Sequence, residues 1–335
     1  MGVSQRFGDS VGYLLAGAVA AVRPENLAVV PMRRLAMLTP ESAAEFNGVP
    51  AVGDEMTFIG LGALGSQLFM NLWRSGFGRW TLIDRDLHLP HNDSRHVLIN
   101  GIGEFKANAM ANFAAAIFPE HASVAVGRHI AHSYGGHRRI SAFLNPSAKD
   151  LILLVEPADR SIRLDQLEMM YYRAVIQDRR LEGHLIRGDA PVRYSNACRD
   201  LSTVISQDHI AVHAGIGSRA IRIALTSPYA MIPIWRGDDN GAVARIDVPI
   251  ARPAGYTANG WKVLLDSEVQ ETVASYRLTH LPNETGGVLL GSFDMTRKVV
   301  LISLPLSSPE DSKEWPTVYI RGSAGLRSGW AGVCG

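Results

Sequence analysis

The chain has 335 residues, of which 47% are hydrophobic and 19% charged, and its formal net charge is +1. This composition is typical of a globular protein long enough for two domains, and it excludes a largely disordered chain. The near-zero net charge gives no electrostatic reason to expect a nucleic acid or an anionic membrane as partner. The two cysteines, Cys198 and Cys334, are too few for a disulfide framework or a four-cysteine zinc site, which favours a reducing cytoplasm.

Residues 1–50 are expected to form a mainly helical N-terminal segment. The apolar run at 13–22 is too short to span a membrane and lacks the flanks of a signal peptide, so we interpret it as a buried helix. A short strand is expected at 27–32. Thr39 and Pro40 then predict the start of another helix, because threonine caps helices and proline is tolerated at the first helical position.

Residues 57–130 alternate between strand and helix patterns. Strands are expected at 57–61, 80–84 and 123–130, and helices at 66–76 and 104–118. Such alternation is typical of an α/β fold with a doubly wound parallel sheet. A further apolar strand at 150–156 and helices at 160–175 and 208–225 extend this pattern, so residues 51–250 are expected to form one nucleotide-binding domain.

A glycine-rich turn joins the first strand to the first helix of this domain. Gly60, Gly62 and Gly65 form a G-x-G-x-x-G pattern, which lets backbone N–H groups and a helix N-terminus approach a phosphate without Cβ atoms in the way. The same turn also occurs at nicotinamide and flavin sites. The next strand ends at Asp84, where a carboxylate can reach a ribose hydroxyl.

Four further polar residues follow Asp84 in the sequence: Asp86, Asn92, Arg95 and, eleven residues after Arg95, Lys106. A dehydrogenase has no need for an asparagine, an arginine and a lysine that converge on the phosphates. A nucleotidyl-transfer site does, because charge develops on the α-phosphate and the leaving pyrophosphate and must be met by cations. The pattern therefore favours nucleotidyl transfer.

The motifs GLGALG, LIDRD, HNDSRH and IGEFKA resemble the ThiF/MoeB family of ubiquitin-activating-enzyme-like adenylyltransferases. The resemblance implies a Rossmann-like fold that uses ATP and Mg²⁺ to adenylate the C-terminal carboxylate of a ubiquitin-like or sulfur-carrier modifier protein. It implies that Gly60, Gly62 and Gly65 bind ATP and that Asp84 contacts the ribose. It further implies that Asp86 and Asn92 hold nucleotide or Mg²⁺. Arg95 and Lys106 are implied as the catalytic cations that neutralise the phosphates.

Two features depart from that family's pattern or extend it. Between residues 130 and 150 the family pattern would place a strand ending in an Asp-Ala-Thr-Asp-like turn. Within that interval no acidic residue precedes Asp150, and Asp159 is the nearest later candidate.

Cys198 lies where related enzymes carry a cysteine in a crossover loop. Two nearby arginines could lower the pKa of its thiol for a thioester role, whereas a small buried hydrophobic residue is the alternative.

The composition changes after residue 243. Pro253, Gly255 and Gly260 predict a linker, and residues 261–335 resemble the start of a JAMM/MPN domain, a zinc-dependent isopeptidase fold, through a helix followed by Glu284-Thr-Gly-Gly. In that family the glutamate carried over onto Glu284 is the general base for zinc-bound water. The His-x-His-Pro ligands are missing, so we expect a partial α+β domain with no zinc site and no isopeptidase activity.

Two rival interpretations stay open at this point. A NAD- or FAD-dependent oxidoreductase would bind a dinucleotide without Mg²⁺ and would not need Lys106. A catalytically defective scaffold would bind a modifier or a nucleotide and release no pyrophosphate. The expected partners are the modifier, a conjugating enzyme and, by analogy with the family, a second copy of the chain; neither nucleic acid nor membrane is expected.

Overall fold

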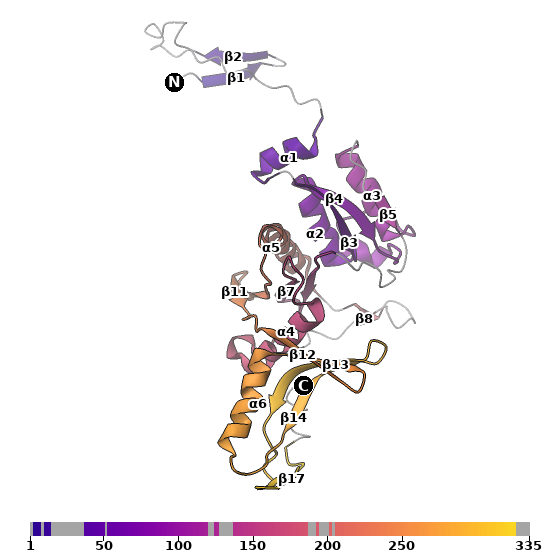
Figure 1. Cartoon of the computed structure of the whole chain (residues 1–335). Coiled ribbons are helices and arrows are strands. Elements are labelled where there is room, and N and C mark those ends of the chain that lie inside the picture. The colour runs from indigo at the N-terminus through magenta and orange to yellow at the C-terminus, as the bar shows by residue number, and fades with distance from the viewer. Residues whose placement is uncertain are drawn as a thin grey trace. The chain divides into compact units, whose positions relative to one another are not determined.

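The computed structural model describes residues 3–7, 10–14, 37–50, 52–119, 124–126, 137–186, 192–193, 201–202 and 205–325 (Figure 1). The chain divides into two compact units, Met1–Leu38 and Thr39–Gly335. No helix within these described ranges has both the length and the apolar character needed to span a bilayer.

The first unit contains an antiparallel hairpin of β1 (Val3–Phe7) and β2 (Ser10–Leu14). The helix expected at 13–22 is therefore wrong at its start, because Tyr13 and Leu14 belong to β2. A Gly-Asp pair separates the strands in the sequence, and such pairs favour hairpin loops over helices. The remainder of 13–22 and the strand expected at 27–32 lie outside the described residues.

The second unit begins with α1 (Pro40–Asn47), which confirms the helix start predicted at Thr39 and Pro40. The backbone N–H of Ser42 donates to Thr39 Oγ1 at 3.2 Å. This bond satisfies one of the first-turn N–H groups that no helical carbonyl can reach. The helix ends at Gly48, whose φ of +62° is the left-handed conformation that glycine adopts most readily.

A parallel sheet follows in the predicted alternation of strand and helix. Its elements are β3 (Val52–Ile59), α2 (Ala63–Arg74), β4 (Phe77–Ile83), α3 (Lys106–Ile117) and β5 (Val124–Val126). The strands pair in parallel in the order β3-β4-β5, which confirms the parallel sheet. The 3-10 helix η3 (Pro90–Ser94) lies within the connection from β4 to α3.

The strand at 150–156 does not continue that sheet. It forms β7 (Asp150–Val155) in a second sheet of order β11-β10-β7-β6, where it pairs antiparallel with both neighbours. The expectation that the doubly wound parallel sheet extends through this strand is therefore wrong. Five residues, 145–149, connect β6 (Ile140–Leu144) to β7, and a parallel pair needs a crossover of a dozen residues or more.

The remaining elements of this region are two strands, two longer helices and three short segments. The strands are β10 (Pro233–Gly237) and β11 (Val243–Asp247), and the longer helices are α4 (Leu164–Gln177) and α5 (Gln207–Thr226). The short segments are η4 (Arg179–Leu181), β8 (Val192–Arg193) and β9 (Leu201–Ser202).

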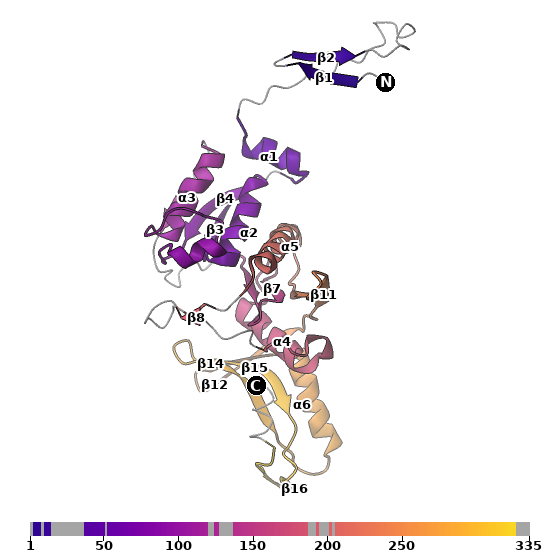
Figure 2. The same cartoon turned by 180° about the vertical axis from the view of Figure 1, so that it is seen from behind.

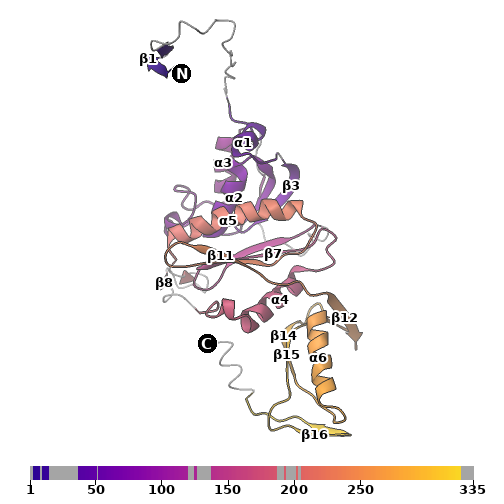
Figure 3. The same cartoon turned by 90° about the vertical axis from the view of Figure 1, so that its left-hand side faces the viewer.

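Helices cover both faces of β7, which explains its continuous apolar run. Leu153 and Val155 point into one core with residues of α2 and α5, while Ile152 and Leu154 point into a second core with residues of α4. Figure 3 shows α5 along one face of this sheet and α4 along the other. Alternate side chains of a strand face opposite ways, so a strand buried on both faces shows no polar alternation in its sequence.

The C-terminal part of the second unit is a mixed sheet of order β12-β13-β15-β14 with one helix. Its elements are β12 (Pro253–Ala258), β13 (Trp261–Asp266), α6 (Ser267–Thr279), β14 (Val288–Asp294) and β15 (Val299–Leu306), followed by the hairpin of β16 (Lys313–Trp315) and β17 (Val318–Ile320). We call residues 253–320 the C-terminal module. In Figure 2, α6 lies beside this sheet, and it contacts both β13 and β15.

The linker expected around Pro253, Gly255 and Gly260 is wrong, because these residues form the β12–β13 hairpin. Asn259 and Gly260 have φ angles of +49° and +74°, as the two central residues of a tight hairpin turn require. Asn-Gly is the strongest short-range hairpin signal, but the neighbouring proline and glycines favoured the interpretation of this stretch as a linker.

A buried arginine of α4 joins the C-terminal module to the rest of the second unit. Arg173 donates from Nη1 to Asp266 Oδ2 at 2.8 Å and to the Ser303 carbonyl at 3.1 Å, and its Nη2 lies 2.9 Å from Glu268 Oε2. Arg173 and Asp266 are each only 4% exposed. The module is therefore fixed to α4 by a charge pair that is removed from water.

Candidate functional site

The glycine turn between β3 and α2 is packed on one side and open on the other. Gly60 has a φ of +88°, and its N–H donates to the Ile83 carbonyl at 2.9 Å. A Cβ at Gly65 would collide with the Gly60 carbonyl, so only glycine fits there. A Cβ at Gly60 or Gly62 would meet nothing within 4 Å. The open side therefore has room for a ligand against the N-terminus of α2.

Asp84, at the end of β4, holds the turn in place. Its Oδ2 accepts the Leu61 N–H at 2.6 Å and its Oδ1 accepts the Asp86 N–H at 2.8 Å. The sequence analysis predicted that Asp84 contacts the ribose, and it did not predict these two hydrogen bonds with backbone N–H groups. Each carboxylate oxygen has a second lone pair, so the ribose contact stays a prediction.

Lys106 and Asp86 come together beside the turn. Lys106 is the first residue of α3 and is 8% exposed, and its Nζ lies 4.0 Å from Asp86 Oδ2. Its backbone N–H donates to the Asp86 carbonyl at 2.9 Å, and Leu87 forms a bridge with Phe105. The connection from β4 thus folds back onto the start of α3 and brings the two predicted residues together.

Asn92 and Arg95 lie in and after η3. Asn92 Oδ1 accepts the Leu89 N–H at 2.8 Å, and the Asn92 carbonyl accepts the Arg95 N–H at 2.9 Å. Gln67, in the first turns of α2, donates from Nε2 to the Arg95 carbonyl at 2.9 Å. The Arg95 backbone is therefore docked on α2, close to the glycine turn, and the role of its side chain at the phosphates stays a prediction.

His96 was not identified from the sequence, yet it contacts the turn directly. It is 7% exposed, and its Nε2 lies 2.7 Å from the Leu61 carbonyl. Burial lowers the pKa of His96 to about 4; the positive charge of Lys106 also lowers it, and the bond to Leu61 opposes this shift. The only sequence signal was its position directly after Arg95.

A second histidine packs behind the first. His88 is fully buried, its Nε2 lies 2.6 Å from Asp93 Oδ1, and its ring packs edge-on against that of His96 at 4.9 Å between centroids. Within the described ranges, no group of three or more His, Cys, Asp or Glu side chains is placed to hold a metal ion.

The two predicted residues outside this region are Cys198 and Glu284. Cys198 lies outside the described residues. Glu284 is exposed and follows α6, and its N–H donates to the Trp315 carbonyl of β16 at 2.8 Å. Side chains at Gly286 and Gly287 would collide with Tyr319 and with the Leu306 carbonyl, so this glycine pair serves close packing within the C-terminal module.

The carboxylates after β7 have local partners. Glu156 is fully buried, and its two carboxylate oxygens accept from Arg160 Nε at 3.0 Å and Arg163 Nε at 3.2 Å. Asp159 accepts from the Ser161 N–H at 3.0 Å and hydroxyl at 2.8 Å, and these hydrogen bonds hold its pKa below the usual range. The sequence flagged Asp159, whereas the paired Glu156 was missed.

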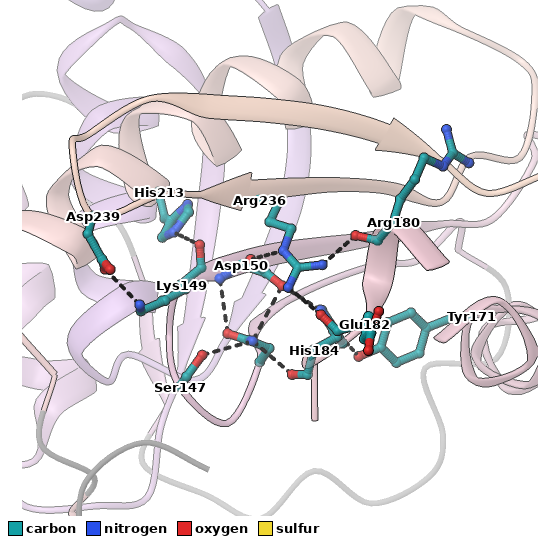
Figure 4. A network of polar contacts seen from close by, with 11 residues as sticks. Ser147, Lys149, Asp150, Tyr171, Arg180, Glu182, His184, His213, Arg236 and Asp239 are labelled. Carbon is teal, nitrogen blue, oxygen red and sulfur yellow. Dashed lines mark hydrogen bonds and ion pairs between the residues drawn. The ribbon is translucent and has the colours of Figure 1, made fainter. Parts of the chain in front are cut away.

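A separate buried polar network surrounds the start of β7 (Figure 4). Asp150 Oδ2 lies 2.5 Å from His184 Nδ1, and His184 Nε2 lies 2.8 Å from the Tyr171 hydroxyl. Burial raises the pKa of Tyr171. Arg236 donates to the carbonyls of Arg180 and Glu182, so the network ties the segment after α4 to the second sheet.

Comparison with known proteins finds a family match over the region just described. A model of the ThiF family matches residues 55–154, which span the glycine turn, Asp84, Asp86, Asn92, Arg95 and Lys106. Residues 55–154 thus match the ThiF family, and they lie within a mixed α/β structure with a parallel sheet. No curated protein sequence matches the chain.

Solved structures show a weaker likeness. Escherichia coli MccB with ATP is 11% identical at a TM-score of 0.42, over 62% of this chain and 66% of that one. MccB with N-formylated MccA is 11% identical at a TM-score of 0.41, over 58% of this chain and 64% of that one. PaaA is 16% identical at a TM-score of 0.39, over 62% and 75%. The chain spans 64% of the length of the first MccB structure.

Proposed function

We propose that the chain uses ATP to adenylate the C-terminal carboxylate of a ubiquitin-like or sulfur-carrier modifier protein. One observation carries this proposal: the glycine turn is open at Gly60 and Gly62, Lys106 lies within ion-pair distance of Asp86, and the Arg95 backbone is docked on α2, the helix that starts at the turn. The match of residues 55–154 to the ThiF family supports it.

The turn suits a polyphosphate for electrostatic reasons. Backbone N–H groups and the N-terminus of α2 attract anions, and the open faces of Gly60 and Gly62 allow close approach. Lys106 lies largely out of water, where its charge is screened less than at the surface. Asp86 and Asn92 would hold Mg²⁺ or the nucleotide, and Mg²⁺ would supply further positive charge on the phosphates.

Adenylation brings two anions, a carboxylate and a triphosphate, into contact. The chain must hold both in position and offset their repulsion, and negative charge grows on the pyrophosphate as it leaves. Arg95 and Lys106 are the cations assigned to this task. In adenylation the modifier carboxylate attacks the α-phosphate and displaces pyrophosphate. A thiol would then attack the acyl-adenylate, forming a thioester and releasing AMP, and Cys198 is the candidate for that step.

The C-terminal module is proposed to be the front part of a JAMM/MPN-like domain that contacts the modifier without cleaving it. The motif around Glu284 and the order of α6, β14 and β15 support this assignment. We further propose that the chain dimerises through the nucleotide-binding domain, that a conjugating enzyme is a second partner, and that the protein is cytoplasmic. The location is supported by the low cysteine count.

ATP–pyrophosphate exchange with modifier proteins that end in glycine tests the proposed chemistry. We expect exchange by the wild type and a loss of about 100-fold or more in Arg95→Ala and in Lys106→Ala, because each variant lacks a cation that we assign to the developing charge. Lys149→Ala is the matched control. Lys149 is half-exposed and pairs with Asp239 at 2.6 Å, so its loss should leave exchange unchanged.

Each outcome separates the proposal from its rivals. Exchange that survives both Arg95→Ala and Lys106→Ala would contradict the roles assigned to these cations. ATP binding without exchange by the wild type would favour the scaffold, and a bound dinucleotide without Mg²⁺ would favour the oxidoreductase.

A further inference from the structure

Three hydrogen bonds attach the segment after η3 to the glycine turn and the start of α2. Gln67 Nε2 donates to the Arg95 carbonyl at 2.9 Å, and the Val97 N–H donates to Ser66 Oγ at 3.3 Å. Between them, His96 Nε2 lies 2.7 Å from the Leu61 carbonyl. Only the His96 bond reaches the turn itself, because Ser66 and Gln67 already belong to α2.

The second ring nitrogen fixes which atom of His96 carries the proton. The Leu98 N–H donates to His96 Nδ1 at 3.1 Å, so Nδ1 must be an unprotonated acceptor. The neutral ring then carries its hydrogen on Nε2, which donates to the Leu61 carbonyl. Both ring nitrogens are therefore satisfied by backbone groups, in one tautomer and one orientation.

Holding the Leu61 carbonyl also sets the direction of the next N–H. The Leu61 carbonyl and the Gly62 N–H belong to the same planar trans peptide, in which the two bonds point in opposite directions. His96 is buried and draws the carbonyl inward, so the Gly62 N–H points away from it. Gly62 is the position where a Cβ would meet nothing within 4 Å.

Asp84 holds the preceding peptide in the same way. Its Oδ2 accepts the Leu61 N–H at 2.6 Å, so the peptides on both sides of Leu61 are held by buried or half-buried side chains. Leu61 itself is fully buried. The turn thus has one imposed orientation and does not depend on a ligand to acquire it, which lowers the ordering cost of binding.

We propose that His96 is a positioning residue of the nucleotide site: by donating to the Leu61 carbonyl it orients the Gly62 N–H toward the ligand phosphates. This inference rests on the proposed function for the identity of the ligand. It assigns His96 no contact with the nucleotide and no proton transfer.

The chain offers a matched control in another buried histidine. His213 is 2% exposed, its Nε2 lies 3.0 Å from the Lys149 carbonyl, and burial lowers its pKa as it does for His96. His213→Ala removes the same kind of bond at the start of β7, so it reports the general cost of losing a buried histidine.

The first measurement is the affinity for Mg²⁺-ATP by titration calorimetry, with the thermal midpoint of each variant. We expect His96→Ala to weaken ATP binding about 10- to 100-fold, the worth of one hydrogen bond to a charged group, and His213→Ala to leave it within about 2-fold. His96→Gln keeps an N–H donor that can reach the Leu61 carbonyl and should recover most of the affinity.

The second measurement, by NMR, does not depend on the function. In the wild type, the imidazole ¹⁵N shifts of His96 should show the neutral Nε2–H tautomer, and the Gly62 amide resonance should move in His96→Ala but stay in place in His213→Ala. An Nδ1–H tautomer, an unmoved Gly62 amide, or equal ATP affinities for the two alanine variants would overturn the inference.

Failure of the inference and failure of the proposed function give different results. If the wild type binds ATP, His96→Ala loses that affinity, and no exchange with pyrophosphate occurs, the inference stands and adenylation is refuted. If exchange occurs and His96→Ala keeps its ATP affinity, adenylation stands and the role of His96 is refuted.

Discussion

Lys106 is a charged side chain with little water around it, and among the residues that the structure describes Asp86 is the carboxylate that lies within ion-pair distance. Asp86 Oδ2 lies 4.0 Å from its ammonium, the outer limit of an ion pair, and the Asp86 side chain is 59% exposed. A phosphate oxygen at hydrogen-bond distance would interact more strongly than Asp86 does now. An anion that enters the open side of the turn therefore gains a partner that the folded chain has only partly neutralised.

The lowered pKa of His96 leads to a prediction about how the free energy of unfolding changes with pH. The pKa is about 4 in the folded chain and 6.5 without the fold, so the folded state binds fewer protons, and the stabilisation present above pH 6.5 is lost as the pH falls toward 4. Between pH 7 and pH 5 this should remove about 2 kcal/mol from the free energy of unfolding. Urea unfolding at both pH values measures it.

His96→Gln has no titrating ring, so it should lose about 2 kcal/mol less than the wild type over the same interval. An equal loss in both proteins would show that His96 does not titrate with the lowered pKa that its burial implies.

Sequence reasoning found the residues whose roles depend on local pattern. Gly60, Gly62 and Gly65 follow from the pattern of a single turn, and Lys106 follows from the motif that resembles the family's lysine-bearing helix. It missed His96, because the Leu61 carbonyl that defines its role is 35 positions away in the chain. A histidine's partners are set by the tertiary fold, and a single sequence does not show them.

At the scale of elements, the prediction of a parallel strand at 150–156 failed because two strand arrangements share one sequence pattern. β7 is a continuous apolar run, which a parallel strand and an antiparallel strand buried on both faces produce equally. The five residues that connect β6 to β7 decide between them, but the β6 strand had not been recognised. The α2, α3, α5 and α6 helices were predicted because their patterns are long.

The buried ion pair between Arg173 of α4 and Asp266 of the C-terminal module leads to a prediction about stability. Arg173→Met leaves the carboxylate of Asp266 buried without its charge partner, and we expect a loss of about 3–5 kcal/mol in the free energy of unfolding. Arg245→Met is the control, since Arg245 and Asp247 form an exposed pair at 2.7 Å whose loss should cost at most about 1 kcal/mol.

Chemical denaturation measured by circular dichroism compares the two arginine variants. Equal stabilities for Arg173→Met and Arg245→Met would mean that the buried pair does not hold the C-terminal module to α4.

At the scale of the whole molecule, the residues of the candidate site lie within the part of the chain that matches the family. Residues 55–154 contain the open glycine turn and its flanking charges. Of the second sheet, β6 and nearly all of β7 lie within the match, whereas β10, β11, α5 and the C-terminal module lie beyond it. The helix α5 contacts α2 through a 3.2 Å hydrogen bond from Gln67 to Gln207. Sequence patterns predicted the helices α5 and α6 outside the matched region, whereas the antiparallel second sheet was not predicted.

The most direct test is calorimetric titration of the wild type and Gly62→Ala with Mg²⁺-ATP and with NAD⁺. A Cβ at Gly62 meets no protein atom within 4 Å, so this variant should keep its thermal midpoint while the methyl group blocks the phosphates. We expect the wild type to bind ATP and not NAD⁺, and Gly62→Ala to bind ATP at least about 10-fold more weakly. Tighter binding of NAD⁺ than of ATP, or an unchanged ATP affinity in Gly62→Ala, would contradict the account.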